Sequence, residues 1–324
     1  MPHCIRILTL LSLILLSGAS AIVFAQEAGK SNSTRAILVT GASSGIGKQI
    51  AHTLAEEGYF VYAGARKQKD ITALSQLPNM QGVRLDVTKD SDISSAVKLI
   101  EKEGRGLFGL VNNAGVFIYD PLIEVSEEDM QFINDVNVMG PYKVNKAFAP
   151  LIIKSRGRIT TIGSISGLFS GRLFGPYSMS KHSMEAYTEA LAAEMEKFEV
   201  KVSIVEPGNF RSNIMKNMEK RLHSIRQGQR PTQYQKEIEK LASFVISDRS
   251  HHAEPTPVAN AVLNFMSADK TKLRYMVTPN QREANLAIKR SLQKVIELNQ
   301  DHEFSLNDES LVEMLRELMA KARK

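Results

Sequence analysis

Short apolar runs alternate with amphipathic segments along most of this chain, and this alternation restricts the fold more than any other feature of the sequence. The first apolar run, residues 36–40, leads into a helical pattern at about residues 46–57. Repeats of this kind are typical of βα units, which assemble into a parallel sheet. The run at residues 202–205 is apolar at nearly every position, as expected for a strand whose two faces are both covered by helices.

We therefore predict an α/β fold with a single Rossmann-type, doubly wound parallel sheet of about seven strands and helices on both faces. An α/β domain of about 250 residues routinely folds as one unit, so one main domain is expected in this chain of 324 residues. The predicted strands are residues 36–40, 59–64, 83–87, 107–112, 158–163, 201–206 and 273–278.

The domain organisation follows from where these patterns begin and end. We assign residues 35–290 to the Rossmann-fold domain, after a polar linker at residues 26–34 and an apolar segment at residues 1–25. Residues 209–257 are rich in charged and amide side chains and lack a strand signal, so we predict a helical insertion on the substrate side. Residues 291–324 continue with helical patterns and form a predicted C-terminal extension.

Composition and charge exclude several classes of function. Lysine and arginine exceed aspartate and glutamate by six, but these charges are scattered rather than gathered into a basic block, which argues against nucleic-acid binding. The single cysteine, Cys4, lies in the N-terminal segment, so the rest of the chain has no disulfide and no cysteine nucleophile. His251 and His252 lack further spaced ligands, so we predict no metal site.

Three glycines follow the first predicted strand. Gly41, Gly45 and Gly47 have the spacing Gly-x3-Gly-x-Gly and come just before a predicted helix. A tight turn at this position brings backbone N–H groups and the helix N-terminus against phosphate, as in dinucleotide-binding folds. A purely structural turn is the alternative, and the position between a strand and a helix favours the dinucleotide.

The end of the second predicted strand indicates which dinucleotide binds. NAD sites usually carry an acidic residue about 20 positions after the glycine loop, where it holds the ribose 2′-hydroxyl. Residues 59–65 contain no carboxylate, and Arg66 and Lys67 follow directly. An arginine there can contact a 2′-phosphate instead. We predict NADP rather than NAD; the alternative, that Arg66 and Lys67 form only a solvated loop, leaves the choice open.

Tyr177 and Lys181 are four residues apart in a helical pattern, so their side chains share one face of the helix. A phenol has a pKa of about 10, and a nearby ammonium favours its ionised form. Ser164 follows the predicted strand at residues 158–163, at the edge where α/β sheets bind ligands, and its hydroxyl can hold a substrate oxygen. Because a Tyr-x3-Lys pair is common by chance, its interpretation as a catalytic pair depends on the presence of this serine and of the glycine loop.

These motifs, in this order, resemble those of the short-chain dehydrogenase/reductase family over about residues 34–279. The family's Thr-Gly-x3-Gly-x-Gly loop, Asp-Val pair and Asn-Asn-Ala-Gly element are present without alteration. The cofactor site that the resemblance implies consists of Gly41, Ser43, Ser44, Gly45, Ile46, Gly47, Arg66, Asp86, Val87, Asn113, Ala114, Gly115, Tyr177, Lys181, Pro207, Gly208 and Ser212. Ser212 stands where the family usually has a threonine, and this substitution keeps the hydroxyl.

The resemblance also implies a catalytic tetrad of Asn137, Ser164, Tyr177 and Lys181. In the implied reaction, hydride passes between nicotinamide and a carbinol carbon while Tyr177 exchanges a proton with the carbinol oxygen. Ser164 would orient that oxygen, and Asn137 would link a water molecule to the lysine. Lys181 would hold the nicotinamide ribose and lower the pKa of the phenol. The chain is therefore expected to be an oxidoreductase acting on CH–OH groups.

Apolar side chains flank the catalytic motifs and indicate a lipophilic alcohol or ketone as substrate. These side chains are Phe117, Leu168, Phe169 and Phe174. Residues 61–66 and 273–275 are similar to the branch of the family that acts on steroids and retinoids. Two alternatives stay open: reduction of a carrier-bound 3-oxoacyl chain, with Arg211 and Lys216 contacting the carrier, and a non-catalytic NADP(H)-binding sensor or scaffold.

An uncharged apolar stretch, residues 7–25, precedes the domain. It suits either a cleaved signal peptide or a retained membrane anchor, since about 20 residues span a bilayer. An exported domain would meet little NADP(H), so we favour membrane association through this stretch, with export as the outcome if it is cleaved. The resemblance further implies pairing through helices, and we expect a homodimer or homotetramer that binds a small-molecule substrate.

Overall fold

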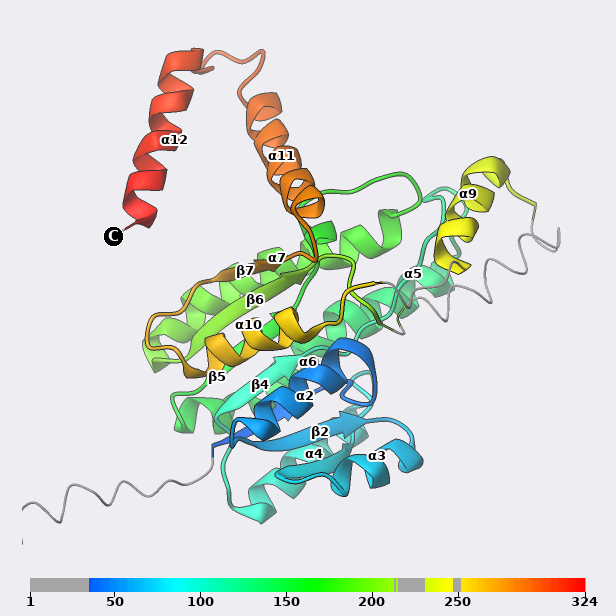
Figure 1. Cartoon of the computed structure of the whole chain (residues 1–324), viewed down its shortest axis with the longest axis vertical. Helices are drawn as coiled ribbons and strands as arrows, with labels where there is room; N and C mark the ends of the chain where they lie inside the picture. The colour runs from blue at the N-terminus through cyan, green and yellow to red at the C-terminus, as the bar shows by residue number, and fades with distance from the viewer. Residues whose placement is uncertain (1–34, 213, 215–230, 247–251, 324) are drawn as a thin grey trace, which may run out of the picture. The chain divides into compact units, whose positions relative to one another are not determined.

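A computed structural model describes residues 35–212, 214, 231–246 and 252–323, and these residues follow the predicted βα alternation (Figure 1). The predicted N-terminal segment and linker lie outside the described residues. Seven parallel strands form one sheet in the order β3-β2-β1-β4-β5-β6-β7, so the predicted fold class is confirmed. The strands are β1 (Ala36–Val39), β2 (Phe60–Ala65), β3 (Met80–Arg84), β4 (Gly109–Asn112), β5 (Arg158–Ile162), β6 (Lys201–Pro207) and β7 (Arg274–Val277).

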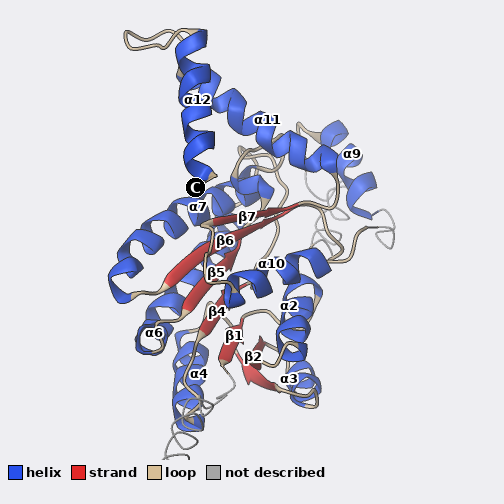
Figure 2. Cartoon of the chain, turned by 60° about the vertical axis from the view of Figure 1, so that its left-hand side comes forward, coloured by secondary structure: helices blue, strands red, loops and turns tan. Residues whose placement is uncertain are grey.

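Helices cover both faces of this sheet (Figure 2). The α-helices are α2 (Gly45–Glu56), α3 (Gln68–Ser75), α4 (Asp90–Glu103), α5 (Glu127–Asn134), α6 (Gly140–Lys154), α7 (Gly175–Met195), α9 (Gln235–Ile246), α10 (Thr256–Ser267), α11 (Gln281–Leu298) and α12 (Asp308–Ala322). Helices α2, α3 and α10 pack on one face, and α4, α6 and α7 pack on the other. In β1, Ile37 and Val39 pack against α2, α3 and α10, whereas Leu38 packs in the core on the other face of the sheet. Both faces of the strand are therefore buried, which explains why it is apolar at every position.

The strand order reverses at β1, which pairs with β2 on one side and with β4 on the other. Connections that leave β1 and β4 therefore run to opposite faces, and the carboxyl ends of these strands frame the crevice where α/β folds bind ligands. Thr40 and Gly41 follow β1, and Asn113 follows β4. The predicted glycine loop and the Asn-Asn-Ala-Gly element thus lie together at this crevice.

The third strand differs from its prediction, because the sequence places it at residues 83–87 and the structure has it at Met80–Arg84. The apolar residues of the predicted strand are buried, which accounts for the misleading pattern. Asp86 ends the strand: its carboxylate accepts hydrogen bonds from the backbone N of Thr88 at 3.1 Å and from Oγ1 of Thr88 at 2.8 Å. This local turn competes with continued strand pairing.

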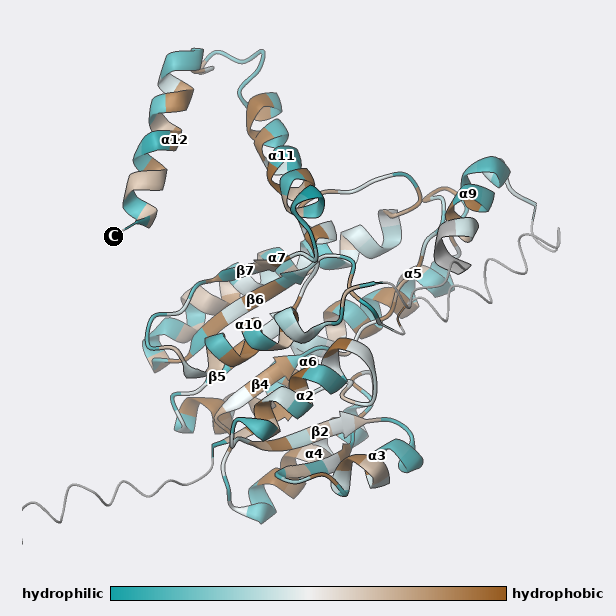
Figure 3. Ribbon diagram, in the orientation of Figure 1, coloured by the Kyte–Doolittle hydropathy of each residue, from teal (hydrophilic) through white to brown (hydrophobic). Residues whose placement is uncertain are grey.

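The C-terminal helices begin earlier than predicted, because α11 crosses the boundary expected between residues 290 and 291. Hydrophilic and hydrophobic positions occur together on α11 and α12 (Figure 3), and α12 has no buried residue. In the predicted insertion at residues 209–257, the described part contains α9 and no strand, while residues 213, 215–230 and 247–251 lie outside it. Among the helices described, none is both long and apolar enough to cross a membrane.

Candidate active site

The glycine loop between β1 and α2 has a shape that requires glycine. Gly41 and Gly45 have φ angles of +66° and +55°, in the left-handed region that favours this residue. A Cβ atom on Gly47 would lie 2.2 Å from Nδ2 of Asn113 and 2.5 Å from the carbonyl oxygen of Gly41. The loop therefore packs tightly at the N-terminus of α2, which favours an anionic group such as a pyrophosphate.

Two polar side chains tie the glycine loop to the segment after β4. The Oγ1 atom of Thr40 accepts hydrogen bonds from the backbone N–H groups of Asn113 and Ala114, each at 3.0 Å. In return, Nδ2 of Asn113 donates to the carbonyl oxygens of Thr40 and the following glycine at 2.9 and 3.2 Å. A Cβ atom on Gly115 would lie 3.5 Å from Oδ1 of Asn137, so the same segment reaches the predicted catalytic residues.

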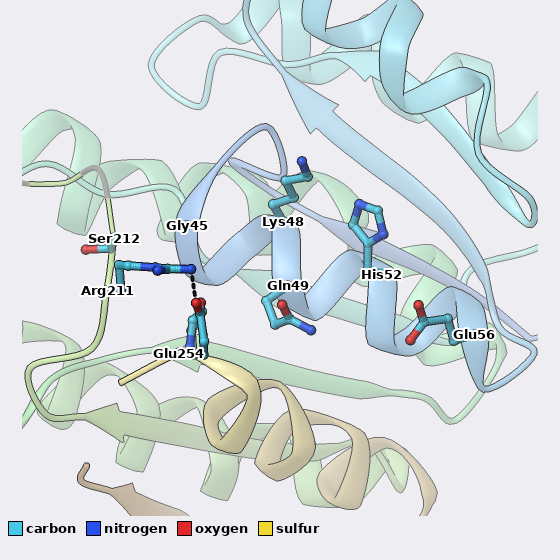
Figure 4. Close-up of a pocket in the computed structure, with 9 residues that line it drawn as sticks. Gly45, Lys48, Gln49, His52, Glu56, Arg211, Ser212 and Glu254 are labelled. Atoms are coloured by element: carbon cyan, nitrogen blue, oxygen red, sulfur yellow. Dashed lines mark ion pairs between the residues drawn. The ribbon is translucent and has the colours of Figure 1, made fainter. Parts of the chain in front are cut away.

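A pocket along α2 joins the glycine loop to the segment after β6 (Figure 4). Its lining consists of Gly45, Lys48, Gln49, His52, Glu56, Arg211, Ser212, Glu254 and Pro255. Ser212, which is predicted to bind the cofactor, thus shares a pocket with Gly45, and Arg211 pairs with Glu254 at the same place. Of the other predicted loop residues, Ser43 and Ser44 are exposed and Ile46 is half-buried. Lys216 lies outside the described residues.

The edge of the sheet at β2 and β3 carries two arginines. Arg66 directly follows β2 and is exposed. At the end of β3, Nη1 of Arg84 donates to the carbonyl oxygen of Arg66 at 2.6 Å, and its Nε pairs with Asp92 at 2.9 Å. Arg84 was not among the predicted site residues, because the apolar pattern places the third strand later in the chain. Asp86 and Val87, which are predicted to bind the cofactor, lie just after the end of β3.

Pro207 ends β6, and the turn that begins at Gly208 is held by two other elements. The backbone N–H of Gly208 donates to the carbonyl oxygen of Val277 in β7 at 2.8 Å. On α11, Oε2 of Glu283 accepts a hydrogen bond from the backbone N–H of Asn209 at 2.7 Å. A Cβ atom on Gly208 would lie 2.3 Å from the same carboxylate oxygen, so glycine is needed for this close approach.

Ser164, Tyr177 and Lys181 come together between β5 and α7. Each of them is less than a tenth exposed. Ser164 caps a short 3-10 turn, η2 (Ile165–Gly167), and its Oγ accepts a hydrogen bond from the backbone N–H of Ser166 at 3.1 Å. The hydroxyl of Ser164 acts on the phenol of Tyr177 and lowers its pKa. The structure thus brings these side chains into one buried group, and their catalytic roles stay predictions.

Asn137 lies in a π-helical turn, η1 (Asp135–Met139). Its Oδ1 accepts a hydrogen bond from the backbone N–H of Val116 at 2.8 Å, and its Nδ2 donates to the carbonyl oxygen of Val116 at 2.9 Å. Nδ2 also donates to Oγ of Ser180 at 3.0 Å, and that hydroxyl donates to the carbonyl oxygen of Tyr177 at 2.8 Å. Asn137 therefore supports the first turn of α7. Ser180 was not among the predicted site residues, although it lies within the Tyr-x3-Lys motif.

Burial dominates the electrostatics of the group. It raises the pKa of Tyr177 to about 12, and the hydrogen bond with Ser164 opposes this rise. It lowers the pKa of Lys181 to about 8, and the charge of Glu185 opposes this fall. The Nζ atom of Lys181 donates to the carbonyl oxygen of Ile162 at 2.8 Å and lies 5.6 Å from the ring centroid of Tyr177. The expected lowering of the phenol pKa is thus wrong for this structure, because burial outweighs an ammonium that is bound to a carbonyl.

Aromatic rings pack beside Tyr177. The ring centroid of Phe117 lies 4.2 Å from that of Tyr177 and 4.0 Å from that of Tyr119. Phe174 completes the cluster at 4.1 Å from Tyr119. Sequence reasoning identified the two phenylalanines but missed Tyr119, which follows Phe117 by two residues and was open to the same argument. Leu168 and the residue after it are half-buried.

Comparisons with known proteins place these observations in context. Residues 35–223 match a family model described as short chain dehydrogenase. The chain is 31% identical over 265 residues to the mitochondrial D-beta-hydroxybutyrate dehydrogenase of Bos taurus, which covers 75% of this chain and 76% of that protein. It is 37% identical over 193 residues to Retinol dehydrogenase 7 of Mus musculus, which covers 58% and 60%. A short chain dehydrogenase/reductase from Burkholderia phymatum, solved in complex with NAD, has a TM-score of 0.69 at 25% identity and covers 85% of this chain and 98% of that structure.

Proposed function

Because the chain belongs to the short-chain dehydrogenase/reductase family and is an oxidoreductase acting on CH–OH groups with NAD(P), we propose that it interconverts a lipophilic alcohol and the corresponding carbonyl compound. Tyr177 is the acid/base of the proposed reaction. The observation that carries this proposal is the buried pair of Ser164 and Tyr177, in which the serine hydroxyl acts on the phenol, with Lys181 one helical turn away.

The crevice at β1 and β4 suits a dinucleotide. Gly47 packs closely against Asn113, and Gly41 makes a tight turn, so backbone atoms and not side chains face the N-terminus of α2. Residues of this loop and Ser212 would hold the group, and its nicotinamide supplies the hydride donor or acceptor when bound. The protein's own contribution is to orient the substrate oxygen and to move one proton.

Tyr177 moves that proton, and Ser164 orients the oxygen. In reduction, the phenol donates its proton to the carbonyl oxygen of the substrate; in oxidation, the phenolate takes the proton of the alcohol. Because burial raises the pKa of Tyr177, the phenol is protonated at neutral pH and ready to donate. With a pKa of about 8, Lys181 is mostly charged at neutral pH, and its ammonium would hold the ribose of the bound nicotinamide.

We propose NADP(H) as the cofactor on the strength of the β2–β3 edge. Arg66 is exposed directly after β2, at the position where NAD sites usually have a carboxylate, and Arg84 adds a second guanidinium beside it. Guanidinium groups bind phosphate through charge-assisted hydrogen bonds, whereas a ribose 2′-hydroxyl has no use for them. The 2′-phosphate of NADP is the proposed ligand of Arg66.

The proposed substrate is steroid- or retinoid-like. The rings of Phe117, Tyr119 and Phe174 beside Tyr177 provide apolar surface, whereas a small hydroxy acid would need a cation for its carboxylate. Two apolar side chains near the start of α7 are exposed: Leu122 at 56% and Met179 at 49%. Such exposed apolar groups around a polar centre favour a lipophilic ligand.

Turnover of a panel of ketones and alcohols with NADPH, NADP⁺, NADH and NAD⁺ tests this proposal. The panel includes steroids, retinoids, short hydroxy acids and a carrier-bound 3-oxoacyl chain. We expect turnover of a steroid or retinoid, with kcat/KM higher for NADP(H) than for NAD(H). Faster reaction with NAD(H) would contradict the role of Arg66, and cofactor binding without turnover of any compound would favour a sensor or scaffold.

We also propose that the protein is attached to a membrane through residues 7–25 and pairs as a homodimer or homotetramer. The apolar composition of that stretch supports the first proposal, and the family resemblance supports the second. Fractionation of cells that express the full chain tests attachment: recovery in the alkali-washed membrane pellet is expected, and recovery in the soluble fraction would contradict it. Light scattering of the detergent-solubilised chain tests the oligomer, and a monomer mass would contradict it.

A further inference from the structure

Two buried glutamates lie next to the catalytic helix, and the reaction described above does not use them. Glu206 is the last residue but one of β6, and its side chain is 2% exposed. Glu185 lies on α7, and its side chain is 11% exposed. It follows Lys181 by four residues, so the two side chains share one face of the helix. Glutamates are almost never buried to this degree unless they are paired.

One arginine reaches both glutamates. Arg274 is the first residue of β7, and its Nε donates a hydrogen bond to Oε2 of Glu185 at 3.1 Å. The same Nε lies 4.0 Å from Oε1 of Glu206. Nη2 of Arg274 forms an ion pair with Glu189, one turn further along α7. A single guanidinium thus faces three carboxyl groups, so its charge cannot balance all three in their ionised forms.

A proton bound between the two buried glutamates would satisfy their unpaired oxygen atoms. Their Oε1 atoms are buried without a hydrogen-bond partner among the described protein atoms, although the two side chains lie within hydrogen-bonding reach of each other. Ionised carboxylates only accept hydrogen bonds, whereas a protonated carboxyl group also donates one. The η2 turn after Ser164 packs on the same group, since a Cβ atom on Gly167 would lie 3.1 Å from Oε1 of Glu185.

The charges around the pair agree with one bound proton. Burial is the main influence and raises the pKa of both glutamates, and repulsion from Glu185 raises the pKa of Glu206 further. The neighbouring charged groups are Lys181 and Glu189 on α7, Arg274 on β7, and Glu283 on α11, which binds the turn beyond β6. With one shared proton, the negative charges of the pair and of Glu189 balance the positive charges of Arg274 and Lys181, while the carboxylate of Glu283 accepts a hydrogen bond from the backbone N–H of Asn209.

We propose that Glu185 and Glu206 share one proton, and that the single negative charge left on the pair keeps Lys181 protonated for catalysis. The proposal rests on the function proposed above for Tyr177 and Lys181. It makes the two glutamates positioning residues that act through Lys181. The charge of Glu185 opposes the fall that burial causes in the pKa of Lys181, which is the effect that the proposal requires.

Infrared spectroscopy of the full chain, titrated with pH in the absence of substrate, tests the shared proton. A protonated carboxylic acid has a C=O stretching band that is distinct from the bands of a carboxylate. We expect this band at neutral pH, its loss as the pH rises, and its absence from the Glu206→Gln variant. A chain without the band at neutral pH, or a band that survives in Glu206→Gln, would overturn the proposal.

The pH dependence of kcat/KM tests the action through Lys181. Glu206→Gln keeps the carboxylate of Glu185 and supplies an amide donor, so it is the matched control. The double variant Glu185→Gln/Glu206→Gln removes the charge of the pair. We expect the alkaline limb of the profile to lie at lower pH in the double variant than in Glu206→Gln. If the alkaline limb lies at the same pH in both variants, the charge of the glutamate pair does not act on Lys181, and this part of the proposal is overturned.

A readout without turnover separates this proposal from the proposed function. The free energy of unfolding rises with pH where folded Lys181 releases its proton, and Lys181→Met removes this rise. In a double variant whose circular dichroism shows a folded chain, the rise should begin at lower pH than in the unaltered protein. The same onset in both would overturn the proposal. The infrared band and the pH at which stability begins to rise can both behave as expected while no compound is turned over. That result would contradict the proposed enzymatic function and support the shared proton of the carboxyl pair.

Discussion

Replacing Lys181 with methionine is expected to make the protein more stable at neutral pH while removing a group that the proposed reaction uses. Burial lowers the pKa of Lys181 from 10.5 to about 8. Since each pKa unit corresponds to about 1.4 kcal/mol, keeping this ammonium charged costs the folded state about 3 kcal/mol. Methionine has a similar length and no charge, but it leaves the carbonyl oxygen of Ile162 without its 2.8 Å hydrogen bond. That loss costs about 1 kcal/mol, so the expected net gain in the free energy of unfolding is about 2 kcal/mol.

The pH dependence of this gain identifies its cause. The folded pKa of Lys181 is lower than the unfolded pKa, so between about pH 8 and 10.5 the unfolded state binds more protons and the unaltered protein becomes more stable as the pH rises. The Lys181→Met variant lacks that rise, so its advantage is constant below about pH 8 and shrinks above it. Urea unfolding of both proteins at about pH 7 and about pH 9.5 measures the two differences. The reasoning is refuted if the variant is less stable at neutral pH, or if its advantage does not shrink.

Three further substitutions test other parts of the site. Arg66→Ala should raise KM for NADPH by about 10- to 100-fold and leave KM for NADH nearly unchanged, because it removes charge-assisted contacts to the 2′-phosphate; equal effects in steady-state assays with the two cofactors would contradict this. Gly47→Ala should lower the melting temperature and weaken NADP⁺ binding in thermal shift assays, since its Cβ atom would lie 2.2 Å from Nδ2 of Asn113; unchanged binding would show that the loop has room to adjust. Ser180→Ala should destabilise the fold by about 1 to 3 kcal/mol in urea unfolding, because it leaves the amide of Asn137 with a buried unpaired donor, and an unaltered midpoint would argue against the link to α7.

The sheet could be predicted because its signals are local. A parallel strand covered on both faces is apolar at nearly every position, as in β1. The glycine or polar residues that follow such a run indicate where the strand ends. The third strand was misplaced because its prediction used only this local apolar pattern. Its apolar pattern continues past the last paired residue, and the turn that ends it depends on the side chain of Asp86, which periodicity does not report.

Spacing alone predicts the candidate site only where its parts are close in sequence, and the more distant parts came from the family resemblance. Tyr177 and Lys181 share a helix face by spacing alone, whereas the contact between Arg274 and Glu185 joins residues 89 positions apart and follows from the packing of β7 against α7. Spacing also fails to give the direction of a side chain. The Nζ atom of Lys181 turns to the carbonyl oxygen of Ile162, so the expected effect on the phenol pKa does not appear.

Reduction of the best substrate with NADPH by the Tyr177→Phe variant tests the central claim most directly, because phenylalanine keeps the ring and removes the proton. Tyr187→Phe is the matched control: Tyr187 lies on the same helix, and its hydroxyl accepts a hydrogen bond from Nδ2 of Asn145 at 2.9 Å, away from Ser164. We expect kcat to fall by about 100- to 10,000-fold in Tyr177→Phe, with NADPH still bound, and to stay within about twofold in Tyr187→Phe. A Tyr177→Phe enzyme whose kcat matches that of the control would contradict the account.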